Sequence, residues 1–178
     1  MLNRKVIAQN ITNLTDARYF AAWGVDYISF NTIPDSPFFL TTEKLLEIKE
    51  WVEGPQFLLE TNALEMEEIA DGFILSNIYS SLPIVKESFF RITFEDIQKG
   101  LPPGKYISPI DSAGINYLKQ QASDELLGID LYFDVSSLNI EEISQLENFG
   151  IVIQGGEEEK VGVKSFDDLD EIYELLMD

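Results

Sequence analysis

The feature that most constrains the fold is an alternation of short apolar runs with capped helical patterns along the whole chain. Eight runs rich in β-branched or aromatic residues each end at a polar residue or a turn, which is typical of buried strands. Eight strands separated mostly by helical patterns predict a parallel sheet, and eight units predict closure into a barrel. The expected strands are residues 6–11, 27–31, 56–60, 73–77, 88–93, 105–110, 131–135 and 151–154.

The first unit sets the pattern for the expected helices. Asn13 is predicted to begin a helix with Asp16 as its capping-box partner, and Gly24 is predicted to end it. Further helical patterns cover residues 41–52, 63–70, 94–99, 112–127, 139–149 and 165–176. The pattern weakens after the third, fourth and fifth strands, and no convincing helix follows the fourth. The prediction is therefore an α/β fold with a single domain over residues 1–178, a compact and degenerate (βα)8 TIM barrel with helices shortened or missing around strands 3–5.

An open, doubly wound sheet is the structural alternative. Such folds place a glycine-rich phosphate-binding fingerprint after the first strand, and none follows residues 6–11 here. The barrel is therefore favoured.

Charge and composition narrow the function classes. The chain has 12 Lys and Arg against 32 Asp and Glu, a net charge of −20, which repels phosphate backbones and anionic lipids, so neither nucleic acid nor a membrane is expected as a partner. There is no Cys and no His, which excludes disulfides, thiolate nucleophiles and Cys-type zinc sites and removes the commonest general base. No cofactor and no resident metal are expected. Without a signal-like or membrane-spanning apolar run, a cytoplasmic location is expected.

Both ends of the chain resemble the phosphoribosylanthranilate isomerase family, small (βα)8 barrels of tryptophan biosynthesis. Residues 11–17 and 23–30 are similar to the family's first helix start and second strand, and Ser36-Pro37 stands where the family has Ser-Pro-Arg. Near the other end, residues 138–143 resemble the Leu-Asn-Pro-Glu-Asn-Val that follows the family's phosphate-binding glycines. Residues 162–175 resemble its Gly-x-Lys-Asp and last helix. The likeness covers about residues 5–52 and 129–176.

The departures from the family pattern bear on activity. The resemblance puts the family's catalytic cysteine, the general base at the end of strand one, on Gln9, and the following glycine on Asn10. An amide cannot accept a proton usefully near neutral pH. The substrate-contacting arginine becomes Phe38. The family's general-acid aspartate corresponds to Asp111, although the glycine-rich stretch that should follow is absent.

Two groups of residues are candidate sites. The last two turns of such barrels cradle phosphate on backbone N–H groups, here Ser136-Ser137-Leu138 and Gly155-Gly156, against the alternative of two ordinary tight turns. The second group is polar residues at strand ends, which converge on one face of a parallel barrel: Gln9, Asn31, Glu60, Asn77, Asp111, Asp134 and Gln154. Glu60, Asp111 and Asp134 could serve a hard cation or divide acid and base roles, or polar residues could simply finish the strands; for Glu60 the second interpretation is favoured.

Three hypotheses follow. The leading one is an isomerase-like barrel without isomerase activity that still binds a small phosphorylated metabolite. The second is an active aldose–ketose isomerase, or another sugar-phosphate enzyme, working with Asp111 and a substitute base. The third is a non-catalytic scaffold whose mouth is closed by side chains such as Phe38. A monomer or a homodimer is expected in each case.

Overall fold

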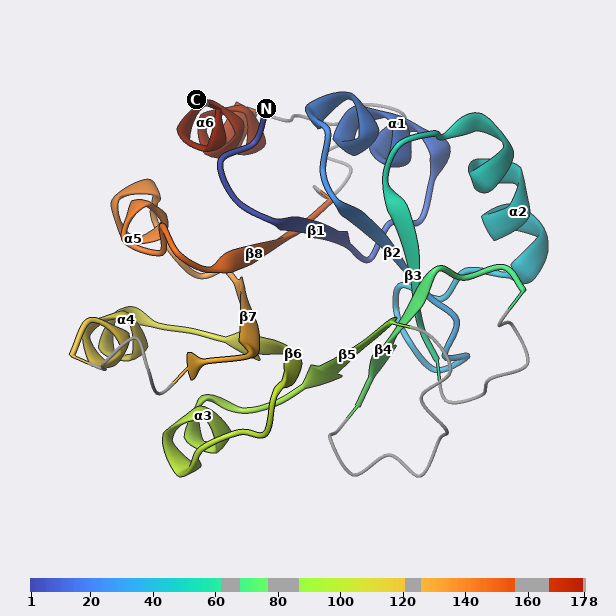
Figure 1. The fold of residues 1–178 in the computed structure, drawn as a ribbon. Helices are drawn as coiled ribbons and strands as arrows, with labels where there is room; N and C mark the ends of the chain where they lie inside the picture. Colours follow the sequence, from blue (N-terminus) through green and yellow to red (C-terminus); the bar gives the residue numbers. More distant parts are fainter. Residues whose placement is uncertain (62–67, 77–86, 121–125, 156–166, 178) are drawn as a thin grey trace.

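The eight strands close into one barrel in the order of the sequence. A computed structural model describes residues 1–61, 68–76, 87–120, 126–155 and 167–177. Every strand is parallel to both neighbours, and β1 pairs with β8 to complete the ring (Figure 1). This confirms the predicted (βα)8 barrel. The strands are β1 (Val6–Gln9), β2 (Tyr27–Asn31), β3 (Gln56–Glu60), β4 (Gly72–Leu75), β5 (Glu87–Arg91), β6 (Gly104–Pro109), β7 (Ile129–Asp134) and β8 (Gly150–Gln154).

Helices surround the barrel, and several are short. Within the described ranges, helices follow β1, β2 and β5 to β8, and three of them are no longer than seven residues. Residues 68–70, in the predicted helix at 63–70, are not helical, and the rest of that segment and residues 77–86 lie outside the described part. The helices are α1 (Leu14–Trp23), α2 (Thr42–Trp51), α3 (Phe94–Lys99), α4 (Ser112–Leu118), α5 (Ile140–Ser144) and α6 (Asp167–Leu176).

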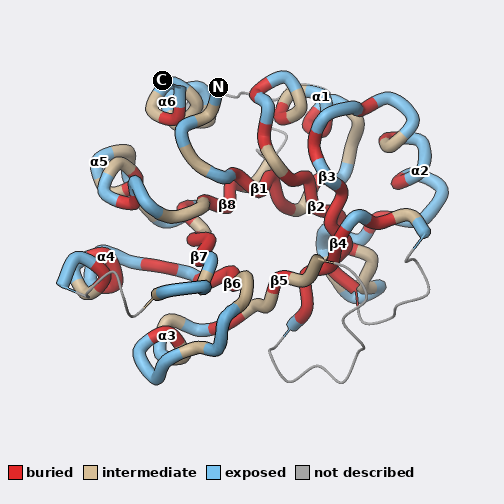
Figure 2. The backbone as a smooth tube through the Cα atoms, in the orientation of Figure 1, coloured by how far each residue is buried: buried red, intermediate tan, exposed pale blue. Residues whose placement is uncertain are grey.

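Burial on both faces explains why the strands read as continuous apolar runs. Figure 2 shows the strands as a buried ring inside helices whose outer faces are exposed. Because successive side chains of a strand point to opposite faces, one set packs outward against the helices and the other fills the barrel. The interior set forms its own cluster of buried residues: Ile7, Tyr27, Leu58, Ile74, Phe89, Ile107, Tyr132 and Val152.

The first strand–turn–helix unit forms as its sequence predicts. The Asn13 side chain accepts a hydrogen bond from the Asp16 N–H at 2.9 Å, and Gly24 ends α1 at a φ of 78°. The last helix then packs against the first, because the Trp23 and Tyr173 rings stack with centroids 4.7 Å apart. The two chain ends lie side by side there, where Leu2 and Met177 form an isolated bridge.

Two predicted helices are longer than the observed ones. The pattern at 112–127 extends beyond α4, which ends at Leu118, and Leu127 is 84% exposed. Lys119 and Gln120, the described residues directly after Leu118, are exposed and pack on nothing apolar, and packing supplies most helical stability.

The prediction at 139–149 fails for a different reason. Its apolar residues recur every three positions, and beyond α5 the backbone forms a series of i+3 bonds, with Leu146 N–H bonded to the Ile143 carbonyl and Phe149 N–H to the Leu146 carbonyl. A spacing of three belongs to 3₁₀-type turns, so the segment buries its apolar residues without continuing as an α-helix.

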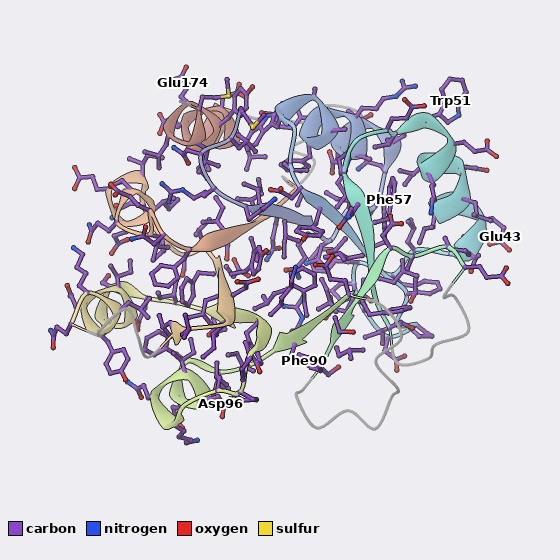
Figure 3. The ribbon with its side chains drawn as sticks, in the orientation of Figure 1. Glu43, Trp51, Phe57, Phe90, Asp96 and Glu174 are labelled. Carbon is purple, nitrogen blue, oxygen red and sulfur yellow. The ribbon has the colours of Figure 1, made fainter. Side chains whose placement is uncertain are left out.

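The acidic residues are mostly on the outside. Glu43 on α2 and Glu174 on α6 point away from the barrel into solvent (Figure 3). None of the described helices is both long enough and apolar enough to cross a membrane.

Candidate functional site at the C-terminal mouth of the barrel

The interior positions nearest the strand ends are polar, in contrast to the apolar layer beneath them. Two residues beyond Ile7, Leu58, Phe89, Tyr132 and Val152, on the same face of each strand, stand Gln9, Glu60, Arg91, Asp134 and Gln154. Asn31 stands four residues beyond the interior Tyr27 and so on the same face of β2, and it is 6% exposed. The structure therefore brings together five of the seven predicted strand-end residues at the C-terminal mouth: Gln9, Asn31, Glu60, Asp134 and Gln154.

Glu60 and Arg91 join β3 to β5 across β4. The guanidinium Nε lies 2.6 Å from Glu60 Oε1 and Nη2 lies 2.8 Å from Oε2, a two-point contact of planar groups. The side chains are 11% and 29% exposed respectively, so the pair is largely desolvated. Glu60 is therefore occupied by a cation from the protein itself.

Gln9 is the polar residue buried at the end of β1. Gln9 is 4% exposed, and its Oε1 atom is buried with no hydrogen-bond partner among the residues that the structure describes. A buried carbonyl oxygen without a partner costs about 1–3 kcal/mol. The position is therefore one where the fold tolerates an unsatisfied group, which is common where a ligand completes the bonding.

Asn10 follows Gln9 with a φ of 58°, the only described non-glycine residue with a positive φ. This left-handed conformation is open to glycine and, among other residues, chiefly to Asn and Asp. It explains physically why asparagine can stand where the resembled family has glycine: the backbone turn is kept.

The turn after β7 is organised by Asp134. Its Oδ1 accepts the Ser136 N–H at 3.0 Å, and its Oδ2 accepts from Gln154 Nε2 at 3.3 Å. The Leu138 N–H is bonded to the Val135 carbonyl at 3.0 Å. Two of the backbone donors expected to hold a phosphate are thus bonded within the protein, one of them to a carboxylate.

Ser137 and Asp111 lie to one side of this mouth. Asp111 is exposed, stands two residues beyond the end of β6, and caps α4 by accepting the Gly114 N–H at 2.8 Å. Both residues line a surface cleft of about 500 Å³ that also includes Phe94 and Gln98. The carboxylate of Asp111 therefore has a structural partner, and its assignment as a general acid stays a prediction.

The second half of the predicted cradle is only partly visible. Gly155 directly follows β8 and is half-buried, whereas Gly156 and Asn77 lie outside the described residues. Among the described residues, no group of three or more Asp and Glu side chains is arranged to hold a metal ion.

Arg91 is the mouth residue that the sequence prediction missed. It stands two positions after Phe89, so the strand alternation could have placed it inside the barrel beside Glu60. The alternation of apolar and polar residues along β5 is the sequence signal that indicates this position.

The fold and the polar mouth define the class of protein: a closed parallel (βα)8 barrel with ionisable and amide side chains where its strands end, the end at which enzymes of this fold build their sites. Comparison with solved structures then identifies which barrels it is most like. Nearly all of the similar structures are phosphoribosylanthranilate isomerases.

Monomers generated from a dimeric phosphoribosylanthranilate isomerase of Thermotoga maritima match with a TM-score of 0.72 at 17% identity, over 97% of this chain and 98% of that one. TrpF from Jonesia denitrificans matches with a TM-score of 0.71 at 14% identity, over 97% and 96%. The Thermus thermophilus isomerase gives 0.66 at 18%, over 97% and 98%.

No protein-family model matches the chain, and no curated protein matches its sequence. The likeness therefore lies in the fold, which this chain shares with these isomerases at low sequence identity.

Proposed function

We propose that this barrel binds a small phosphorylated metabolite at its C-terminal mouth and does not isomerise phosphoribosylanthranilate. The observation that carries the proposal is Gln9, a buried amide at the end of β1 whose oxygen has no partner in the described part of the chain. An amide there can bind a ligand but cannot remove a proton from one.

Two described carboxylates inside the mouth are already engaged, which supports the loss of activity. Glu60 is held at two points by Arg91, and Asp134 accepts bonds from Ser136 and Gln154. The chain contains no His or Cys that could replace the missing base. A cytoplasmic monomer or homodimer completes the proposal.

The phosphate group is proposed for the turns after β7 and β8. The Ser136 N–H already holds one anionic group, the carboxylate of Asp134, so the turn geometry suits an anion. A bound phosphate would take over that donor, and Asp134 would then oppose it by charge repulsion. Affinity is expected to be limited by Asp134, which makes this residue a direct probe of the proposal.

The test combines an isomerase assay with ligand binding. Reduced 1-(o-carboxyphenylamino)-1-deoxyribulose 5-phosphate, the ligand in one of the similar isomerase structures, is titrated by calorimetry beside ribose 5-phosphate. We expect binding without turnover of phosphoribosylanthranilate, and severalfold tighter binding in Asp134→Asn. Lys44→Met on α2, away from the strand ends, is the control variant. Turnover that supports growth of an isomerase-deficient strain would refute the loss of activity. If neither ligand binds, the metabolite site is refuted.

A second candidate keeps the protein an enzyme, with Asp134 as its base. It is favoured by the position of Asp134 inside the mouth, 3.3 Å from Gln154. It predicts measurable sugar-phosphate isomerisation that disappears in Asp134→Asn or, if Asp111 is the acid, in Asp111→Asn, with the fold retained in both.

A further inference from the structure

A cavity of about 900 Å³ lies at the opposite end of the barrel from the polar mouth. It is lined by the beginnings of β2, β6, β7 and β8 and opens beside α4 and the segment that follows α5. Its volume falls within the range of small-molecule sites in proteins, which is about 300–1,000 Å³. The apolar wall includes Ile115 and Leu118 of α4, together with Leu146 and Phe149.

The deep end of this cavity, called the basal cavity, contains the phenol of Tyr132, whose oxygen is not fully buried. Tyr132 is 4% exposed, and its hydroxyl makes no hydrogen bond within the described part of the chain. Its ring occupies the space that a Cβ on Gly150 would need, since such an atom would fall 2.3 Å from Tyr132 Cδ1. Burial raises the pKa of the Tyr132 phenol well above its ordinary value, so the hydroxyl keeps its proton and is available as a donor.

Neighbouring rings hold Tyr132 in place, and Lys105 packs on those rings. Its ring meets Phe89 and Tyr27 edge-on at 5.3 and 6.4 Å, and Lys105 Nζ lies 5.3 Å from the Phe89 centroid. Lys105 is ion-paired with Glu87. Burial alone would lower the pKa of Lys105, but its hydrogen bond to Glu87 and the charge of that carboxylate raise it overall, so the ammonium stays charged.

The basal cavity collects cations in a chain that has few. Four of the 12 Lys and Arg residues line it, Arg4, Lys5, Lys105 and Lys119. Two acidic residues, Asp130 and Glu147, also line it. Because Lys5 and Lys105 are paired with Asp26 and Glu87, the surroundings of the cavity are close to neutral overall. In a protein of net charge −20 this is a place where an anion meets little of the general repulsion.

Two of these cations form no close ion pair, although Glu147 lies near enough to Arg4 for its charge to oppose the lowering of the Arg4 pKa by burial. Lys5 and Lys105 are paired with Asp26 and Glu87, whereas Arg4 and Lys119 form no ion pair within the described ranges. Arg4 Nη1 donates to the Ile143 carbonyl at 3.3 Å, and Lys119 Nζ donates to Gln145 Oε1 at 2.8 Å. Because Ile143 and Gln145 are two residues apart, both cationic heads contact the same short segment at the rim.

We propose that the basal cavity binds a small organic anion with an apolar body. The acidic group of the ligand lies at the rim between Arg4 and Lys119, and its apolar body packs on the wall formed by α4 and Leu146. A polar atom of the ligand accepts a hydrogen bond from the Tyr132 hydroxyl. This site is separate from the proposed mouth site, because its residues come from the other ends of the strands.

The probe for this proposal is 8-anilinonaphthalene-1-sulfonate, an aromatic anion whose fluorescence rises in apolar surroundings. We expect saturable binding of one probe per chain, and at least a tenfold loss of affinity in the double variant Arg4→Met, Lys119→Met, which keeps the apolar stems. Tyr132→Phe tests the deep end and is expected to change the bound emission spectrum or affinity.

Matched controls separate the basal cavity from other apolar or cationic surface. Arg18→Met and Lys44→Met remove charges elsewhere, and Trp51→Ser removes an exposed ring; each should leave the affinity unchanged. Near-ultraviolet circular dichroism checks that every variant keeps its native packing. Unsaturable binding, or equal losses in the cavity and control variants, would overturn the proposal. Displacement of the probe by the mouth ligand would overturn the claim of a separate site.

Discussion

Gln9 shows how a single residue can be poor for stability and informative about function. Gln9 is only 4% exposed, and its side-chain oxygen has no hydrogen-bond partner among the described residues. Natural proteins keep such groups mainly where activity or binding needs them, at a cost in stability. The fold alone would be served better by an apolar side chain of similar length.

We therefore predict that Gln9→Met raises the free energy of unfolding by about 1 kcal/mol, because it removes a buried polar group that lacks a partner. The same variant should weaken binding of the phosphorylated analogue. Urea unfolding and calorimetry measure the two effects. Gln154→Met is the matched control: its amide donates to Asp134, so losing it should not stabilise the protein. A Gln9→Met variant less stable than the parent would show that the amide is structurally satisfied.

At the scale of elements, the Glu60–Arg91 pair supports the part of the barrel with the fewest described helices. It joins β3 and β5 over β4, and no helix is described after either β3 or β4. A side-chain bond between non-adjacent strands ties the sheet together independently of the helices.

We predict that Arg91→Met costs about 2 kcal/mol of unfolding free energy, since it leaves Glu60 desolvated without its partner. The double variant Glu60→Met, Arg91→Met should recover to within about 1 kcal/mol of the parent, because two apolar side chains replace the pair. Urea unfolding of the parent, the single variants Glu60→Met and Arg91→Met, and the double variant gives the coupling energy of the pair. The exposed Glu95–Lys99 pair, one helical turn apart, is the comparison and should couple by only about 0.3–0.5 kcal/mol. Equal coupling in both cycles would contradict the role given to burial.

Much of this architecture could be predicted from the sequence, because strand periodicity and capping act locally. The bounds of β2 and β3, the cap at Asn13 and the short α3 all agree with the pattern. Helix ends were predicted less well. The end of α4 depends on whether distant strands offer a surface to Leu118 and the residues after it, and the sequence does not encode that locally.

The site was predicted in part for a related reason. Strand alternation brings Gln9, Glu60, Asp134 and Gln154 to one mouth, as expected. The pairing of Glu60 with Arg91, and the bond from Ser136 to Asp134, depend on side-chain geometry between strands. The basal cavity was not predicted at all, because its lining comes from segments spread between Asn3 and Gly150.

At the scale of the whole molecule, the balance of charge opposes compactness. A net charge of −20 on 178 residues gives the folded chain a self-repulsion that its few cations relieve only locally. Glu50 and Glu174 add to this repulsion, because they are exposed in the last turns of α2 and α6, where the helix dipole is negative.

Salt should therefore stabilise this protein. Raising NaCl from about 0.01 to 0.5 M shortens the screening length from roughly 30 Å to less than 8 Å, which removes most repulsion between exposed carboxylates. We predict a steady rise of the urea midpoint with an unchanged slope of free energy on urea. The double variant Glu50→Gln, Glu174→Gln should gain a few tenths of a kcal/mol per site at low salt and lose that advantage at high salt. Glu43→Gln is the opposing control, because Glu43 lies in the first turn of α2, where the dipole favours a negative charge, and its removal should gain less. A midpoint that falls with salt would mean that the ion pairs, including those at the basal cavity, outweigh the net repulsion.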